Sequence, residues 1–358
     1  MKEAFIFPGP KVEIRNVDFP TLPTQNHIII KVVVSGSNPK DWAIAERVPG
    51  VNQGDDIAGI VHSVGTDVTN FRPGDRVASF HEMLTPHGSF AEYAVGLEAT
   101  TFHIPPTVSF EEAATIPLAG MTAALGMYQR LGLPLPWFPA QERLPLVVYG
   151  AASAVGAFAV KLATLSNIHP IICVAGRGIA YVESLIDRSK GDTIVDYRKG
   201  NDEVVNGLKH ALGGVGKLSY AFDAVSDKGS YQNLMKVMDM SNGKITLVLA
   251  RKKYEGIPPD FNKSYTQVGK VHSEQYPGIK GEKKLSGLLG DQDFGAIMYK
   301  FFERGLMKGW FKGHPHEVVP GGLGGVQLGL QNLKAGKASA FKYVFRIDET
   351  DGLSRANL

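Results

Sequence analysis

A turn of small residues follows an apolar run near the middle of the chain. The run is Leu146–Tyr149, the turn is Gly150-Ala151-Ala152-Ser153-Ala154-Val155-Gly156, and helical spacing then continues to Leu165. Such a turn lets a pyrophosphate approach the backbone, and the helix start offers N–H groups and the positive end of a dipole. Because Ser153 stands where the usual fingerprint has its middle glycine, the turn alone fits any α/β protein about as well. The strand and helix around the turn favour a dinucleotide.

The next apolar run indicates which dinucleotide this would be. NAD enzymes place Asp or Glu at its end to bind the ribose hydroxyls. Here the run ends in Val174-Ala175-Gly176-Arg177-Gly178, with no acid and one arginine. A guanidinium suits the 2′-phosphate of NADPH, which a carboxylate would repel. We therefore expect NADPH. The alternative is that Arg177 is a solvated residue at a strand end. A second segment, Asp196-Tyr197-Arg198, could close over the same phosphate.

Two regions of different character surround these motifs, and a chain of 358 residues is long enough for two domains. From Met1 to about Thr115, short β-type runs alternate with turn residues, which is typical of a β-barrel. From about Leu144, apolar runs alternate with helical stretches, which predicts a parallel sheet covered by helices on both faces. The further expected strands are Ile171–Val174, Thr193–Val195, Tyr220–Phe222 and Lys244–Leu249. After Gly309 the chain returns to β-type sequence, and we expect Lys342–Ile347 to complete the first domain.

Composition excludes several classes of protein. Hydrophobic residues make up 44% of the chain and charged residues 20%, as in soluble globular proteins, and a net charge of +3 without a basic stripe argues against a nucleic-acid partner. The single cysteine, Cys173, excludes an intrachain disulfide and a Cys-rich zinc site, and its apolar neighbours predict a buried strand position.

No targeting or membrane segment stands out in the sequence. The first residues lack the apolar core of a signal peptide, and the longest apolar stretch, Leu146–Val160, is too short to span a bilayer. We expect a cytoplasmic protein that does not enter a membrane. The last four residues, Arg355–Leu358, faintly resemble a peroxisomal address, which leaves that location as a less favoured alternative.

Several short motifs, in this order and spacing, resemble the medium-chain dehydrogenase/reductase superfamily. The similarity is to its zinc-free quinone oxidoreductase and enoyl reductase branch, which includes fungal ToxD-like, CipB-like and trans-acting enoyl reductase proteins. The motifs are Ser37–Asp41, Gly54–Gly59, Val64-Gly65 with Pro73–Val77, Gly88–Tyr93, Glu112–Pro117 with Thr122, and Asp196–Arg198. The resemblance covers nearly the whole chain. It implies an α/β protein with a GroES-like barrel domain at 1–122, a Rossmann doubly wound parallel-sheet domain at 123–308, and a return to the barrel domain at 309–358.

The same resemblance implies a set of site residues. Lys40 and Asp41 would lie near the nicotinamide, and Thr122 would touch it. The other implied NADPH contacts are Ser153, Ala154, Val155 and Gly156 at the pyrophosphate, Gly176, Arg177 and Tyr197 at the 2′-phosphate, Leu249 and Ala250 at the nicotinamide ribose, and Ser339 and Lys342 in a late Ser-Gly-x-Lys segment whose glycine is Ala340 here. The implied substrate wall consists of Phe80, Met121, Val268 and His272.

The resemblance also locates the zinc ligands of alcohol-oxidising relatives, and this chain lacks them. The matching positions are Asn38, Asp55-Asp56 and Leu118, which supply neither a thiolate nor an imidazole. Adjacent carboxylates point in different directions in a strand, so we expect Asp55 and Asp56 to form a turn pair that accepts backbone N–H groups. Without zinc to lower the pKa of an alcohol, the natural substrate is one that is already electron-poor. An α,β-unsaturated carbonyl or a quinone accepts hydride directly.

The proton donor is harder to assign. Relatives often carry lysine two residues after the Asn-Pro-x-Asp motif, and Ala43 stands there in this chain. Lys40, with Asp41 beside it, is the candidate catalytic group. A solvated turn lysine is an equal alternative for Lys40, and water is a further candidate donor.

The sequence therefore predicts an NADPH-dependent oxidoreductase that acts on a small molecule and reduces an activated (enoyl) double bond without metal. A quinone oxidoreductase is the nearest alternative. An NADPH-binding sensor or structural protein with little turnover is another, and a metal-dependent alcohol dehydrogenase is the least favoured. Relatives occur as monomers and as dimers, so a homodimer is left open.

Overall fold

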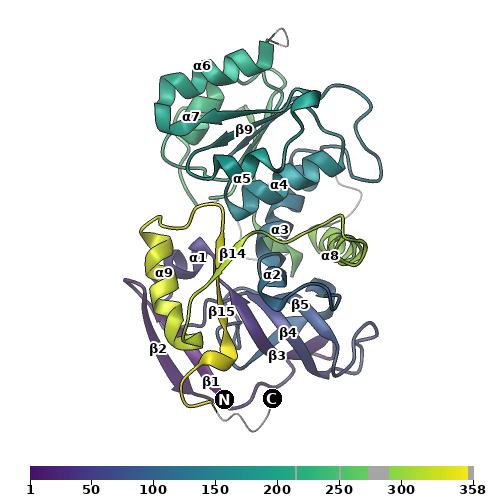
Figure 1. Ribbon diagram of the computed structural model, residues 1–358, viewed down its shortest axis with the longest axis vertical. Coiled ribbons are helices and arrows are strands. Elements are labelled where there is room, and N and C mark those ends of the chain that lie inside the picture. The colour runs from purple at the N-terminus through teal and green to yellow at the C-terminus, as the bar shows by residue number, and fades with distance from the viewer. Residues whose placement is uncertain (214–215, 250, 273–289, 354–358) are drawn as a thin grey trace. The chain divides into compact units, whose positions relative to one another are not determined.

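A seven-stranded sheet forms the barrel predicted for the N-terminal region. The structure is a computed structural model (Figure 1), and it describes residues 1–213, 216–249, 251–272 and 290–353. The strand order is β14-β15-β3-β4-β5-β7, with β6 paired to β3. The bounds are β3 (His27–Gly36), β4 (Asp56–Val64), β5 (Arg76–Phe80), β6 (Tyr93–Leu97), β7 (Thr101–His103), β14 (His316–Val318) and β15 (Lys342–Arg346). Because β15 lies antiparallel to β3, the C-terminal part of the chain completes this sheet.

Most side chains of these strands are buried, in continuous runs such as residues 77–80 of β5. The core of the barrel gathers Ile30, Val61, Phe90 and Phe345 from strands and loops far apart in the sequence. A two-stranded hairpin, β1 (Lys2–Phe7) with β2 (Lys11–Asn16), and the helices α1 (Pro39–Ala45), α2 (Phe110–Ala113) and α9 (Val326–Lys334) complete the surroundings of the sheet. This packing holds α1 and the start of β4, where the polar motifs lie.

The second sheet has six parallel strands in the order β10-β9-β8-β11-β12-β13. They are β8 (Leu146–Tyr149), β9 (Ile171–Ala175), β10 (Thr193–Asp196), β11 (Tyr220–Asp223), β12 (Lys244–Leu247) and β13 (Asn262–Tyr265). Numbered from β8, the order reads 3-2-1-4-5-6, which is the order of a doubly wound dinucleotide-binding fold. The predicted fold class is therefore confirmed. Strand β12 ends two residues earlier than expected.

Helices connect these strands, as the alternating sequence pattern predicted. They are α4 (Ala154–Leu165), α5 (Ile179–Glu183), α6 (Asn201–Leu212) and α7 (Ser230–Met235). Helices α6 and α7 pack on the face that carries Val147 and Tyr149 of β8. Alternation along a strand turns Leu146 and Val148 to the opposite face, and both are fully buried there. Cys173 is buried in β9, as predicted.

The chain divides into two compact units, which we describe separately. The first comprises Met1–Leu118, Val271–Glu274 and Gln292–Leu358, and the second comprises Ala119–Lys270 and Gln275–Asp291. This division differs from the expected boundaries at helix α8 (Asp291–Lys308), most of which groups with the barrel. The helix does so because Tyr299 donates a hydrogen bond to the carbonyl of Pro117 and stacks on Phe102, with 5.6 Å between ring centroids. Within the described parts of the chain, none of the helices combines the length and the hydropathy needed to cross a membrane.

Candidate active site

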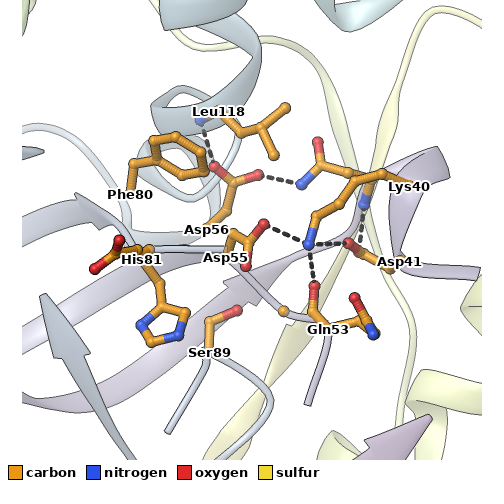
Figure 2. A network of polar contacts seen from close by, with 12 residues as sticks. Lys40, Asp41, Gln53, Asp55, Asp56, Phe80, His81, Ser89 and Leu118 are labelled. Atoms are coloured by element: carbon orange, nitrogen blue, oxygen red, sulfur yellow. Dashed lines mark hydrogen bonds and ion pairs between the residues drawn. The ribbon is translucent and has the colours of Figure 1, made fainter. Parts of the chain in front are cut away.

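Helix α1 carries two of the predicted site residues into a buried cluster of charges (Figure 2). Asn38 precedes the helix, and its backbone N–H donates to Asp41 Oδ2 at 2.7 Å, which fixes the carboxylate at the helix start. The Lys40 ammonium contacts Asp41 Oδ1 at 3.1 Å and also contacts Asp55 Oδ2 and the carbonyl oxygen of Gln53. We call Lys40, Asp41 and Asp55 the Lys40 cluster. The alternative of a solvated turn lysine is wrong, because only 18% of the Lys40 side chain is exposed.

Burial shapes the protonation of this cluster. Asp41 and Asp55 are almost completely buried, and loss of solvent raises the pKa of Asp41 to about 7 and that of Asp55 to about 6, against the opposing effect of the Lys40 charge. Burial works against the charged form of Lys40, but the Asp55 and Asp41 carboxylates outweigh it and raise the lysine pKa. The lysine therefore stays an ammonium, while the two carboxyls titrate near neutral pH.

A second buried ion pair lies beside the first. Asp56 Oδ2 accepts hydrogen bonds from Lys342 Nζ and from Asn38 Nδ2, the latter at 2.7 Å, and Asp56 Oδ1 accepts from the Leu118 backbone N–H at 2.7 Å. Lys342 Nζ also donates to Asn38 Oδ1 at 3.1 Å. The Asp56 side chain has no exposed surface, and that of Lys342 is 4% exposed.

The expectation that Asp55 and Asp56 form a turn pair for backbone N–H groups is therefore wrong for Asp55 and only partly right for Asp56. The pair lies at the start of β4, so the two side chains point in different directions, and each meets a different lysine. Lys40 arrives from α1 and Lys342 from β15. Nothing in the local sequence indicates that two lysines from distant segments would be buried there.

The four positions that match the zinc ligands of alcohol-oxidising relatives do not fit a zinc ion; in this chain they are Asn38, Asp55, Asp56 and Leu118. Zinc sites in proteins are built from thiolates, imidazoles and carboxylates, and here Asn38 and Leu118 provide neither a thiolate nor an imidazole. The carboxylate of Asp56 already has an internal cation, Lys342, together with an amide and a backbone N–H.

Two of the predicted substrate-wall residues lie together in the first unit. The His272 Nε2 atom is 2.8 Å from the carbonyl oxygen of Phe80, and their ring centroids are 4.7 Å apart. Next to Phe80, the buried His81 ring has Nδ1 2.7 Å from the carbonyl oxygen of Val95, and burial lowers its pKa. His81 is therefore neutral and adds no charge to the carboxylates of Figure 2.

The dinucleotide motif of the second unit has the shape that a pyrophosphate needs. Ser153 begins helix α4 and accepts a hydrogen bond on Oγ from the Gly156 backbone N–H at 3.1 Å. A Cβ atom on Gly156 would lie 2.2 Å from the carbonyl oxygen of Gly150, so only glycine permits this close helix–strand approach. Gly150 itself has a φ of +79°, which favours glycine. Ala154 and Val155 form the first turn of α4, so the predicted pyrophosphate residues share one helix start.

The predicted 2′-phosphate residues also lie close together. A Cβ on Gly176 would be 2.5 Å from Tyr197 Cζ, so the tyrosine ring packs directly on the backbone beside Arg177. Tyr197 is 47% exposed. Arg198 is held by Asp196, with side-chain N–O distances of 2.6 and 2.9 Å, and this lowers the pKa of Asp196 to about 2. The predicted contact of Arg177 with a phosphate is tested below.

The remaining predicted residues lie in both units. Met121 and Thr122 are buried in α3 (Pro117–Ala124), Val268 begins a short 3₁₀ turn, and Leu249 is 44% exposed. Ala250 lies outside the described residues. Ser339 and Lys342 belong to the first unit, where Lys342 makes the ion pair with Asp56.

Sequence reasoning missed Gln53 as an acceptor for Lys40 and the π-helical turn Leu125–Arg130 that follows α3. No pattern in the sequence marks the carbonyl of Gln53. The π-helical turn is a feature that often occurs at functional sites, and its six residues continue the helical spacing of α3 without a break.

Comparison with known proteins decides the family. Residues 24–106 match the alcohol dehydrogenase GroES-like domain. Over 326 residues the chain is 45% identical to trans-enoyl reductase fsr4 of Gibberella fujikuroi, covering 90% of this chain and 91% of that protein. The chain belongs to the trans-enoyl reductase branch of the medium-chain dehydrogenase/reductase superfamily. It is an oxidoreductase, as the motifs predicted.

Two further relatives agree with this assignment. Trans-enoyl reductase ACTTS2 of Alternaria alternata is 32% identical over 346 residues, which cover 94% of this chain and 96% of that protein. The crystal structure of the CurK enoyl reductase has the same fold, with a TM-score of 0.74 over 96% of this chain and 98% of that chain at 18% identity. The barrel and the parallel sheet of this reductase are therefore those of its superfamily.

Proposed function

We propose that this reductase transfers hydride from NADPH to the double bond of an α,β-unsaturated carbonyl compound without a metal ion. The observation that carries the proposal is the buried Lys342–Asp56–Asn38 network, which includes two of the positions that the resemblance matches to the zinc ligands of alcohol-oxidising relatives, Asn38 and Asp56. An enzyme with this network needs a substrate that accepts hydride without Lewis-acid help. The names of the similar proteins, trans-enoyl reductases, point to the same class of substrate.

The residues of the second unit fit a reduced pyridine nucleotide, which supplies the hydride when bound. The helix start at Ser153 directs its dipole at a diphosphate, and Gly156 keeps the backbone close enough to approach it. Arg177 carries no acidic neighbour in the segment Val174–Gly178, which supports a 2′-phosphate and hence NADPH. A cytoplasmic location belongs to the same proposal.

A label-transfer experiment tests the reaction. The purified protein is incubated with NADPH deuterated at the transferable position and with panels of enones, enoyl thioesters and quinones, while NADPH absorbance is followed. We expect turnover with the enoyl compounds and deuterium at the β-carbon of the product. Turnover of quinones alone would indicate a quinone oxidoreductase, and tight NADPH binding without turnover would indicate a sensor. Either result would refute the proposal.

The cofactor assignment is tested by replacing Arg177 with aspartate. The change removes a charge-assisted contact, worth about 1.5–3 kcal/mol, and adds a repulsive charge, so the ratio of kcat/KM for NADPH to that for NADH should fall by about 10- to 100-fold. Arg143→Asp, at an exposed position of the same unit, is the charge-matched control and should leave the ratio unchanged. An unchanged ratio in Arg177→Asp would refute the assigned contact.

A further inference from the structure

The Lys40 cluster contains more carboxylates than its ammonium can neutralise. Asp41 and Asp55 share one ammonium, and the neighbouring pair of Asp56 with Lys342 is balanced by itself. With every group ionised, the five side chains would carry one excess negative charge in a site with almost no solvent. An uncompensated buried charge is costly, and the group avoids the cost by taking up a proton.

The contacts show where this proton can reside. The Lys40 ammonium has three acceptors, and on Asp55 it meets only Oδ2. Asp55 Oδ1 is buried and has no hydrogen-bond partner among the described residues. Asp41, in contrast, has Oδ2 fixed by the Asn38 backbone N–H. Burial raises the pKa of both carboxyls, so the two share this proton, and on Asp55 it removes the excess charge while it leaves the Asp41–Lys40 pair intact. His81 is a further titratable side chain nearby, and burial lowers its pKa, which favours the neutral ring.

The cluster opens to solvent at one member only. The side chains of Asp41 and Asp55 are 0% and 1% exposed, while that of Lys40 is 18% exposed. A proton that leaves the cluster for a bound molecule therefore passes through the Lys40 ammonium, which contacts both carboxylates (Figure 2).

We propose that the Lys40 cluster is the proton source of the reaction, with Lys40 as the donor and the buried carboxyls of Asp55 and Asp41 as its reservoir. The proposal rests on the proposed function, because it assigns the second half of that reaction.

The steps balance in atoms and charge. Hydride addition to the β-carbon moves the π electrons of the double bond towards the carbonyl oxygen and leaves an enolate. An N–H bond of Lys40 breaks, its electron pair stays on nitrogen, and a C–H bond forms at the α-carbon. The neutral amine then takes the carboxyl proton of Asp55, which restores the ammonium. Solvent finally returns one proton to the carboxylate, so that no oxidant or further reductant is needed.

Carboxyl titration in the protein without cofactor is the first test. Infrared difference spectra of protein labelled with ¹³C-carboxyl aspartate are recorded between about pH 5 and 8, the range around the values for Asp55 and Asp41. We expect a protonated carboxyl band that disappears as the pH rises through about 6 to 7 and that is lost in Asp55→Asn, whereas the band of Asp223, whose pKa burial raises to about 6, remains in both proteins. In that variant the positive charge of Lys40 is balanced by the negative charge of Asp41, so no excess charge remains. Identical titrating bands in the wild-type protein and in Asp55→Asn would overturn the proposal.

Turnover of three variants provides the second test. Lys40→Arg keeps the positive charge but cannot release a proton, because the guanidinium pKa is above about 12. We expect kcat to fall by about 100-fold or more in Lys40→Arg and Lys40→Met, as for loss of a general acid. Lys334→Met, which removes an exposed ion pair with Glu46 in the same unit, is the matched control and should retain wild-type kcat. Rescue of turnover by arginine would show a purely structural role and would overturn the proposal.

The pH profile separates this proposal from the proposed function. Wild-type kcat should fall as the pH rises through the titration of the reservoir, and Asp55→Asn should lack this limb. Deuterium transfer from NADPH to the β-carbon reports hydride transfer independently of the proton donor. If the wild-type protein transfers no label, the proposed function is refuted. The carboxyl titration still tests whether the Lys40 cluster holds an extra proton. If label is transferred and all Lys40 variants keep the wild-type kcat and pH profile, the proposed function stands. The role of the Lys40 cluster as proton source is then refuted.

Discussion

Several charged side chains of this reductase are buried, and the ion pair of Lys342 with Asp56 affects the stability of the fold. Its ammonium compensates Asp56 in a site where both side chains are at most 4% exposed. Removing one partner of a buried pair leaves the other uncompensated, which typically costs about 3–5 kcal/mol. The ion pair of Lys342 with Asp56 is therefore part of what keeps the barrel folded.

Replacing Lys342 with methionine should lower the free energy of unfolding by about 3–5 kcal/mol, because the Asp56 charge loses its buried partner. The measurement is urea unfolding at neutral pH. The double variant Lys342→Met with Asp56→Asn should recover most of the loss, since the amide carries no charge. Equal destabilisation of the single and the double variant would contradict the role of the ion pair.

Ala340 has a backbone conformation that alanine rarely adopts. Its φ is +61°, a left-handed conformation that costs a non-glycine residue about 1–2 kcal/mol. The family segment that it resembles has glycine at this place. Ala340→Gly should raise the free energy of unfolding by about 0.5–1 kcal/mol, the strain relieved less the entropy that glycine adds to the unfolded chain. Ala338→Gly, at a position without positive φ, should be destabilising, and stabilisation by both changes would refute the explanation.

At the scale of elements, helix α8 is fastened to strand β7 through a histidine between two carboxylates. His103 Nδ1 lies 3.3 Å from Glu303 Oε2 on α8, and its Nε2 lies 3.4 Å from Asp75 Oδ2. Glu303 also contacts Lys300 at 3.1 Å. Hydrogen bonding to Glu303 raises the pKa of His103. Despite burial, which acts in the opposite direction, the bonds from His103 and Lys300 lower the pKa of Glu303 to about 2.

The pH dependence of this contact follows from the two directions. A raised histidine pKa adds stability that is complete below about pH 6.5 and is lost as the pH rises through the folded value. A lowered glutamate pKa adds stability that is present above about pH 4.3 and is lost as the pH falls towards 2. His103→Gln should therefore cost most between about pH 4.5 and 6.5, and close to nothing near pH 9. Because the site is partly exposed, we expect a difference of about 0.5–1 kcal/mol.

The measurement is thermal unfolding of both proteins across this pH range. His316→Gln, an exposed histidine on β14, serves as the control and should show no such window. A His103→Gln difference that does not change with pH would mean that the ion pairs contribute nothing and that packing alone holds α8.

Most helices and strands could be predicted because each one's pattern of apolar residues lies within its own short segment of sequence. Strand β9 and helix α4 lie where their apolar runs placed them, since a strand buried on both faces is continuously apolar. Strand β13 was not predicted, because Asn262–Tyr265 is mostly polar and lies at the edge of the sheet. The partner of α8 could not be predicted either, since an amphipathic helix shows that it packs but not against which sheet.

The site divides in the same way. Gly150 and Gly156 could be predicted because a close backbone approach demands glycine within one short segment. The ion pairs of Lys40 and Lys342 could not, because each joins segments brought together only by the folded barrel, and lysine is ordinarily a solvated residue. A site that depends on the backbone of one short segment can be predicted from the sequence. A site that depends on buried contacts between distant segments requires the structure.

At the scale of the whole molecule, the chain runs from the first unit into the second and back again. The second unit holds all six parallel strands and one hydrophobic cluster that includes Val147, Leu208 and Leu234. The barrel sheet, in contrast, needs β15, whose Tyr343 and Phe345 belong to the core formed by the N-terminal strands. The two units should therefore differ in their ability to fold alone.

We expect a fragment of residues 119–291 to fold by itself and to bind NADPH, because its sheet, its core and the Ser153 helix start all lie within it. Its thermal transition should be cooperative, and NADPH at about 100 times its Kd should stabilise it by about 2.7 kcal/mol. The Arg177→Asp version of the fragment is the control and should lose most of the NADPH effect. A fragment of residues 1–118 should show no cooperative transition, because the β3 edge and the core beneath β15 would be exposed. Adding residues 292–358 through a short linker in place of the second unit should restore the transition, and cooperative folding of 1–118 alone would contradict the dependence of the barrel on its C-terminal strand.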